Sequence, residues 1–172
     1  MKPTRRLSLA RDDAGVAAIE FALALPLLVA LLFGAVEFVQ LFSAARRVDH
    51  AAAAMADVVS QARTVTDAQL SDVMNVAPTL VAPLSTATVG EQISSFTADG
   101  TGKVSKDWTT SNNYSGPAPA VPTGYLAASE SVIVADVTYQ FNSPLRFFIP
   151  GTITFQQHAY VRPRLSAQVA KS

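Results

Sequence analysis

Residues 11–47 read RDDAGVAAIEFALALPLLVALLFGAVEFVQLFSAARR, and the long apolar run within them is the strongest structural signal in the chain. No side chain between Phe21 and Val36 carries a charge. An uncharged run of this length, flanked by more apolar sequence, is close to what crosses a hydrocarbon core of about 30 Å. Ala and Leu dominate the run, which favours a helix over a strand. The sequence therefore predicts one membrane-spanning helix, which we place at residues 16–45.

The composition excludes several classes of protein. The chain has 172 residues with 13 basic and 13 acidic side chains, and its charged fraction of 15% is low. An average soluble protein has about 25%, so the composition favours buried or membrane-embedded surface over disorder. A net charge of zero provides no basic field to capture nucleic acid. The absence of cysteine excludes a disulfide scaffold, a thiolate zinc site and a catalytic cysteine.

Basic side chains flank the apolar run unevenly: Lys2, Arg5, Arg6 and Arg11 precede it, whereas Arg46 and Arg47 follow it. Since basic residues are retained on the cytoplasmic side, we expect a cytoplasmic N-terminus and an extracytoplasmic C-terminal domain. A secretory signal peptide is the alternative, with a cleavage site in the alanine run 51–54. The apolar run is longer than the roughly 7–15 residues of a signal-peptide core, and it holds Glu20 at its front and Glu37 near its end.

The start of the run carries a second pattern. If the chain were cut after Gly15, Val16 would be the first mature residue, Glu20 the fifth and Phe21 the sixth. This arrangement resembles a type III (prepilin-type) signal, in which a basic leader ends in Gly and the fifth mature residue is Glu followed by an aromatic residue. The resemblance implies that a prepilin-type peptidase removes residues 1–15.

The wider sequence resembles the TadE-like pseudopilins of the tight adherence (Tad, or Flp) pilus system. The matching pieces are Glu-Phe-Ala and Leu-Pro-Leu within residues 15–28, Gly34-Ala-Val-Glu37-Phe38, and the Arg-Pro-Arg of residues 162–164. The resemblance implies a minor pseudopilin or assembly factor in the bacterial inner membrane. Its implied partners are the prepilin-type peptidase, other pseudopilins, assembly-platform proteins and membrane lipid. The alternatives are a single-pass envelope protein with an external α+β binding domain unrelated to pili, and an external module released by signal peptidase.

Two glutamates in the run need an explanation, because a carboxylate inside a membrane is expensive, on the order of 2.5–3.5 kcal/mol at the centre and less at the interface. Glu20 lies either in the headgroup layer or against the Val16 amine of a neighbouring subunit, where paired charges cost less than single ones. The resemblance implies a role for Glu20 in recruitment to the assembly. Glu37 lies about 25 Å further along the helix, near the outer interface. It is either solvated there or in contact with another subunit or the assembly platform. We take Glu20, Phe21 and Glu37 as the candidate assembly residues.

The helical pattern continues beyond the membrane. Apolar side chains recur at helical spacing up to residue 62, so that one helix of about 70 Å would cover residues 16–62. Thr66 and Gln69 fit a capping box at the start of a second helix, which we expect Pro78 and Pro83 to end. Strands are predicted at residues 92–98, 103–110, 130–141 and 152–161.

These elements predict an α+β fold of pilin-like architecture, with a long N-terminal helix, a short helix and a small antiparallel β-sheet. We divide the chain into a basic leader (1–15), a transmembrane helix (16–45), a helix extension (46–62) and an extracytoplasmic α+β domain (63–172).

No motif for catalysis, metal or cofactor was found. The Gly-Lys in residues 99–104 lacks the first Gly and the Ser/Thr of a phosphate loop, so a hairpin turn is the better interpretation. His50 and His158 have no metal-ligand spacing. We expect His50 to be solvated on the helix, His158 to lie in the sheet and Asp136 to lie on a solvent face of its strand. The sequence therefore predicts a protein that is not an enzyme and that binds no cofactor.

Overall fold

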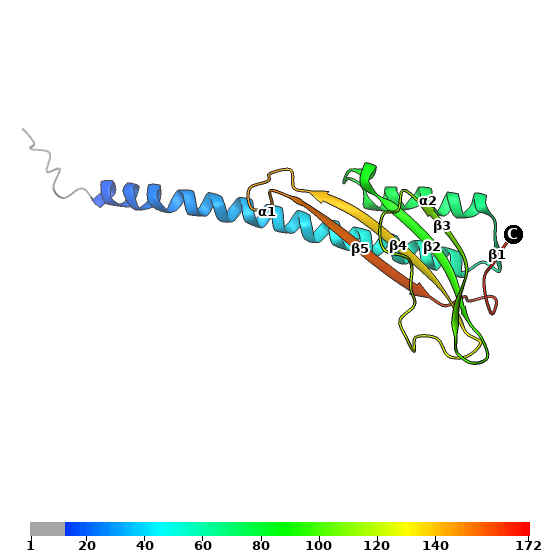
Figure 1. The fold of residues 1–172 in the computed structure, drawn as a ribbon. Coiled ribbons are helices and arrows are strands. Elements are labelled where there is room, and N and C mark those ends of the chain that lie inside the picture. Colours follow the sequence, from blue (N-terminus) through cyan, green and yellow to red (C-terminus); the bar gives the residue numbers. More distant parts are fainter. Residues whose placement is uncertain (1–12) are drawn as a thin grey trace, which may run out of the picture.

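The long N-terminal helix is the dominant element. The computed structural model describes residues 13–172, so the basic side chains of residues 2–11 and most of the predicted leader lie outside the described part. Helix α1 spans Asp13–Ser60, is 48 residues long and continues through Pro26. It projects well beyond the rest of the molecule on its N-terminal side (Figure 1). The single long helix expected from the sequence is confirmed.

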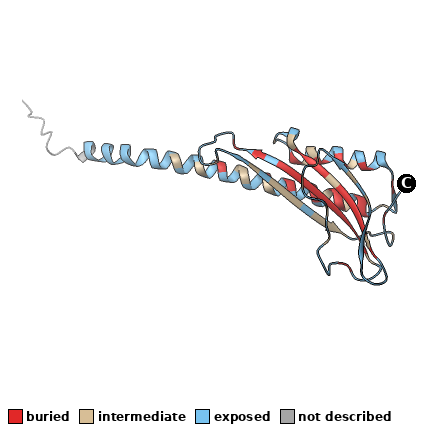
Figure 2. Cartoon of the chain, in the orientation of Figure 1, coloured by how far each residue is buried: buried red, intermediate tan, exposed pale blue. Residues whose placement is uncertain are grey.

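The two halves of α1 have different surroundings (Figure 2). Among the described residues, α1 is the one helix long and apolar enough to cross a membrane, and its most apolar stretch has no buried residue. Small and medium apolar side chains line the buried face of the C-terminal half: Ala44, Val48, Ala51, Ala52, Met55, Ala56 and Val59. The N-terminal half therefore presents its apolar side chains outward, while the C-terminal half belongs to the core.

Helix α2 (Asp67–Val81) follows the two-residue strand β1 (Thr64–Val65). The predicted capping box is present: the hydroxyl of Thr66 accepts from the Gln69 N–H at 3.2 Å, and the Thr66 N–H donates to the Gln69 side chain at 3.0 Å. Of the two prolines expected to end this helix, Pro83 directly follows the C-cap Ala82 as expected, but Pro78 does not end it, because α2 continues to Val81. A proline in the last turn removes one backbone donor, and the complete burial of Val81 offsets that loss.

A four-stranded antiparallel sheet follows the short 3-10 helix η2 (Thr86–Thr88). Its strands are β2 (Gly90–Ala98), β3 (Val104–Asn112), β4 (Ser131–Asn142) and β5 (Thr152–Val161), in the order β3-β2-β4-β5. All four predicted strands are confirmed within two residues at each end. The turn between β2 and β3 is closed by the Gly102 N–H, which donates to the Asp99 carbonyl at 3.0 Å, so the predicted hairpin is also confirmed.

The core lies between the sheet and the helices, and α1 runs along the sheet (Figure 1). Alternate strand residues, such as Ile133 and Ala135, pack with the buried side of α1 and α2. Because successive strand residues point to opposite faces, Val132 and Val134 lie on the other face. There they pack with Leu126 from the connection between β3 and β4.

The C-terminal segment is tied back to the end of α1. The Arg164 N–H donates to the Ser60 carbonyl at 2.9 Å, and the Arg164 guanidinium pairs with Asp57. Arg162 pairs with Glu130 at 2.8 Å. Strand β6 (Ala170–Lys171) then pairs in parallel with β1. Through Arg164, the Arg-Pro-Arg sequence of residues 162–164 thus holds the C-terminal segment against the C-terminal end of α1.

Candidate functional site

The connection between β4 and β5, residues 143–151, meets α1 where the helix leaves the sheet, and we call it the β4–β5 loop (Figure 1). Glu37 of α1 is 1% exposed at this junction. Its two carboxylate oxygens accept four hydrogen bonds from the loop: from the hydroxyl of Ser143 (2.5 Å) and from the N–H groups of Phe147 (2.8 Å), Phe148 (2.7 Å) and Ile149 (3.1 Å). The helix and the loop are therefore joined through a single carboxylate.

The loop backbone is shaped to receive an anion. Arg146 has a φ of 51°, in the left-handed region that non-glycine residues seldom adopt. The Arg146 N–H is also held by Ser143 Oγ at 3.3 Å. The three following N–H groups converge on Glu37, as in the backbone nests that bind anions. Here the anion is the Glu37 carboxylate of the chain itself. It holds the β4–β5 loop against α1, and we call this contact between Glu37 and residues 143–149 the joint.

Gly34, one turn before Glu37, provides space for the same loop. A Cβ at Gly34 would lie 2.9 Å from the ring of Phe148, closer than such contacts normally allow. The absence of a side chain lets the Phe148 ring approach the helix. Residues three apart share one face of a helix, so Gly34 and Glu37 together form the docking surface for the loop. The ring of Phe147 packs edge-on against Phe33, with 5.7 Å between ring centroids.

The expectation that Glu37 is solvated at the interface is wrong, because its carboxylate is buried against the loop. The partner residues lie 106 to 112 positions away in sequence, where no local pattern connects them to α1. The predicted role of Glu37 in contacts with other subunits stays a prediction.

The helix that carries this joint also matches a known family. Residues 15–57 match the TadE-like protein family. The TadE-like segment begins at Gly15 and covers most of α1, including Gly34 and Glu37, but it includes none of the sheet. No curated protein and no solved structure matches the chain.

The other predicted site residues of the TadE-like segment lie on the first turns of α1. Gly15, Val16, Glu20 and Phe21 are all exposed, and an added Cβ at Gly15 would meet nothing within 4 Å. The structure keeps this group apart from Glu37, since Glu20 is about 25 Å away along the helix. Their roles in cleavage and assembly stay predictions.

Two acidic side chains of the sheet, Asp136 and Glu91, are buried. The expectation that Asp136 lies on a solvent face is wrong, because its side chain is 1% exposed and hydrogen-bonded to His158 of β5. Burial raises the pKa of Asp136, and the hydrogen bond from His158 only partly opposes this. Burial likewise raises the pKa of Glu91 to about 7. His158 lies in the sheet and His50 is exposed on α1, as expected. No cluster of three potential metal-ligating side chains occurs in residues 13–172.

The sequence does contain a signal for the burial of Glu91. Glu91 alternates with Ile93 along β2, which puts both on the face that packs against the helices. Asp136 shares a face of β4 with Val132 and Val134, but the burial of that face depends on the residues that cover it.

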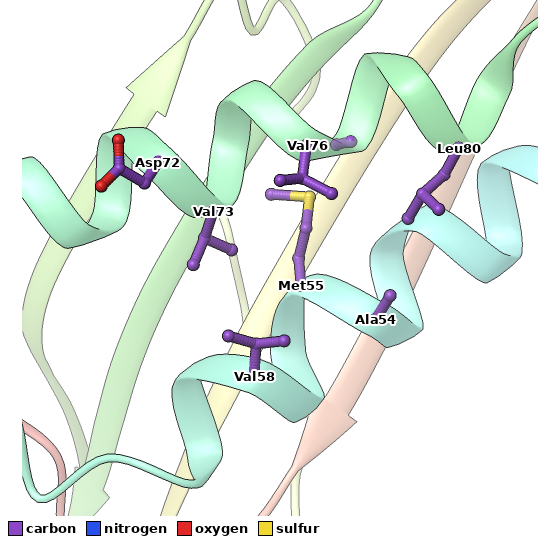
Figure 3. A pocket seen from close by; sticks show the side chains of 8 residues that line it. Ala54, Met55, Val58, Asp72, Val73, Val76 and Leu80 are labelled. Atoms are coloured by element: carbon purple, nitrogen blue, oxygen red, sulfur yellow. The ribbon is translucent and has the colours of Figure 1, made fainter.

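A groove lies between α1 and α2 (Figure 3). It has a volume of about 220 Å³, and its lining is apolar apart from one carboxylate: Ala54, Met55, Val58, Asp72, Val73, Val76, Ala77 and Leu80. Such a lining provides contact area for apolar side chains, but its only ionisable group is Asp72.

Proposed function

We propose that this TadE-like chain is a membrane-anchored minor pseudopilin or assembly factor of a tight adherence (Flp-type) pilus. The observation that carries the proposal is the family match of residues 15–57, which begins at the predicted cleavage site. The exposed apolar half of α1 supports membrane anchoring. In this proposal the helix crosses the bacterial inner membrane once, with the N-terminus in the cytoplasm and the α+β domain in the periplasm.

Processing by a prepilin-type peptidase would prepare the helix for assembly. The cut after Gly15 frees the amine of Val16, and the Glu20 carboxylate of a neighbouring subunit is its counter-charge. Pairing matters because an unpaired charge in an apolar medium is far more costly than a paired one. The exposure of Val16 and Glu20 on the free half of α1 supports this pairing between subunits. The other partners in this proposal are further pseudopilins and the assembly platform.

The processing step is tested by replacing Gly15 with leucine. A side chain at this position meets nothing within 4 Å, so the described fold tolerates it, and any loss of cleavage reflects recognition by the peptidase. We expect N-terminal sequencing to find Val16 in the parent and Met1 in Gly15→Leu. The control Ala18→Leu, also on the exposed helix, should be cleaved normally. Cleavage of Gly15→Leu after residue 15 would overturn the proposed processing, and a parent that begins at Met1 would favour the single-pass envelope protein.

The assembly role is tested by Glu20→Ala. Since Glu20 is exposed and far from the sheet, the variant should be cleaved, inserted and as resistant to protease as the parent. Alanine also has the better helix propensity. We expect pilus formation and surface adherence to fall. Normal pili from this variant would show that Glu20 has no part in assembly.

A further inference from the structure

The β4–β5 loop lies at a defined depth along α1. From Val16 to Glu37 the helix rises about 30 Å at 1.5 Å per residue, which is also about the thickness of a hydrocarbon core. When Val16 lies at the inner boundary, Glu37 therefore lies at the outer one. The contacts with Gly34 and Glu37 fix the loop at this outer level of α1.

The loop exposes large apolar side chains at this level. Its sequence, Ser-Pro-Leu-Arg-Phe-Phe-Ile-Pro-Gly, contains no acidic residue. Leu145, Phe147 and Phe148 are 43%, 55% and 58% exposed. The rings of Phe147 and Phe148 are in contact, with centroids 4.9 Å apart, and Phe147 also packs on Phe33 of the helix. They thus extend the exposed apolar surface of α1 sideways onto the external domain.

We propose that the β4–β5 loop inserts Leu145, Phe147 and Phe148 into the outer interfacial layer of the membrane lipid. The proposal rests on the membrane-anchoring part of the proposed function. Apolar and aromatic side chains beside a basic residue are typical of segments that lie in this layer. Arg146 supplies the basic group, and its long side chain reaches toward headgroup phosphates while its stem stays in apolar surroundings.

The joint makes this insertion possible. Backbone N–H groups without partners are costly in an apolar medium, and the Glu37 carboxylate accepts hydrogen bonds from three consecutive ones. The same bonds remove the need to solvate the carboxylate. Helix and loop then enter the interfacial layer as one unit, which sets the angle between the external domain and the membrane.

The test uses a tryptophan placed in the loop. Trp108 is replaced by phenylalanine in the full-length chain, and Phe147→Trp is then the only tryptophan. The protein is reconstituted into phosphatidylcholine–phosphatidylglycerol vesicles whose acyl chains carry bromine either near the headgroup or near the methyl end. We expect emission shifted to the blue, with strong loss of fluorescence from the shallow bromine and weak loss from the deep one. Leu145→Trp, made in the same way, provides a second reporter.

Two controls separate the possible failures. Leu27→Trp in the same background reports on the spanning helix and should be quenched by the deep bromine. The native Trp108 donates to the Val169 carbonyl at 2.8 Å on the far part of the sheet and should not be quenched by either lipid. Quenching at residue 27 without quenching at residue 147 or 145 would overturn the lipid contact while anchoring stands. The absence of quenching at all three positions would overturn both. A loop tryptophan shielded from bromine and from aqueous iodide would indicate a protein partner and also overturn the lipid contact.

Discussion

Glu37 at the joint and Glu91 in the sheet are both 1% exposed, yet their surroundings are opposite. Glu37 accepts four hydrogen bonds, three of them from successive backbone N–H groups. Glu91 accepts one, from the Asn112 side chain at 3.1 Å, and its Oε1 has no hydrogen-bond partner within residues 13–172. Buried polar groups stabilise a fold only when they are satisfied. The comparison indicates that hydrogen bonds stabilise the buried carboxylate of Glu37. The burial of Glu91 follows from its position on β2 and costs free energy of folding.

The same substitution should therefore have opposite effects at the two sites. Glu37→Gln is expected to have the largest effect, because an amide has only one acceptor oxygen and presents its own donors to the loop N–H groups. The β4–β5 loop should detach, and hydrogen exchange at residues 147–149 should approach the rate of an unstructured peptide. Glu91→Gln, measured under the same conditions, should leave these three amides protected. Unchanged protection in Glu37→Gln would contradict the joint.

At Glu91 the substitution should stabilise the protein at high pH. Burial raises the pKa of Glu91 from 4.5 to about 7, so the folded state binds this proton more tightly than the unfolded state. Stability is then complete below about pH 4.5 and falls as the pH rises through 7. The loss is at most about 3 kcal/mol, at 1.36 kcal/mol per pKa unit. Glutamine stays neutral at every pH, so Glu91→Gln removes this contribution to the pH dependence of stability.

Denaturant unfolding, followed by the fluorescence of Trp108 on the neighbouring strand, provides the measurement at about pH 5 and about pH 8. The parent should lose stability between the two, and Glu91→Gln should lose less. Burial also raises the pKa of Asp136, so Asp136→Asn should change the pH dependence of stability in the same direction as Glu91→Gln. If the parent and Glu91→Gln lose equal stability between the two pH values, the pKa of Glu91 is not raised by burial.

The sequence predicted what depends on local signals. The length of α1 followed from its periodicity, and the start of α2 followed from the Thr66–Gln69 spacing. The four strands followed from their residue composition and the turns between them. The uncharged run of residues 21–36 also separated the exposed half of α1 from the half that packs on the sheet.

The failures have a common physical cause. Glu37 was placed correctly on the helix, but its partners lie more than a hundred residues later. Asp136 shares its face of β4 with the polar Thr138 and Gln140, yet that face is covered too at Asp136 and Thr138. Pro78 locally favours the end of a helix, but α2 continues past it to Val81, whose side chain is packed in the core. In each case a contact distant in sequence outweighs the local preference.

Removal of the single donor to Glu91 should have a moderate effect. Asn112 lowers the pKa of Glu91 against the effect of burial, so Asn112→Ala should raise that pKa further. The cost should be about 1 kcal/mol, a typical value for one hydrogen bond, and it should appear only where the carboxyl is ionised. Unfolding at about pH 8 should show the loss and unfolding at about pH 5 should not. A loss of equal size at both pH values would mean that Asn112 acts through packing rather than through the charge.

Ser143→Ala should have the smallest effect of the four, because it removes one donor from a carboxylate that keeps three. The Ser143 hydroxyl donates to Glu37 at 2.5 Å and accepts from the Arg146 N–H at 3.3 Å. Without the hydroxyl, the Arg146 N–H loses its acceptor, whereas the N–H groups of residues 147–149 keep theirs. Hydrogen exchange should accelerate at Arg146 and change little at the next three residues. If Ser143→Ala releases the whole loop as Glu37→Gln does, the backbone N–H groups alone do not hold the carboxylate. The number of hydrogen-bond donors would then no longer explain the contrast between Glu37 and Glu91, which accepts one hydrogen bond from Asn112.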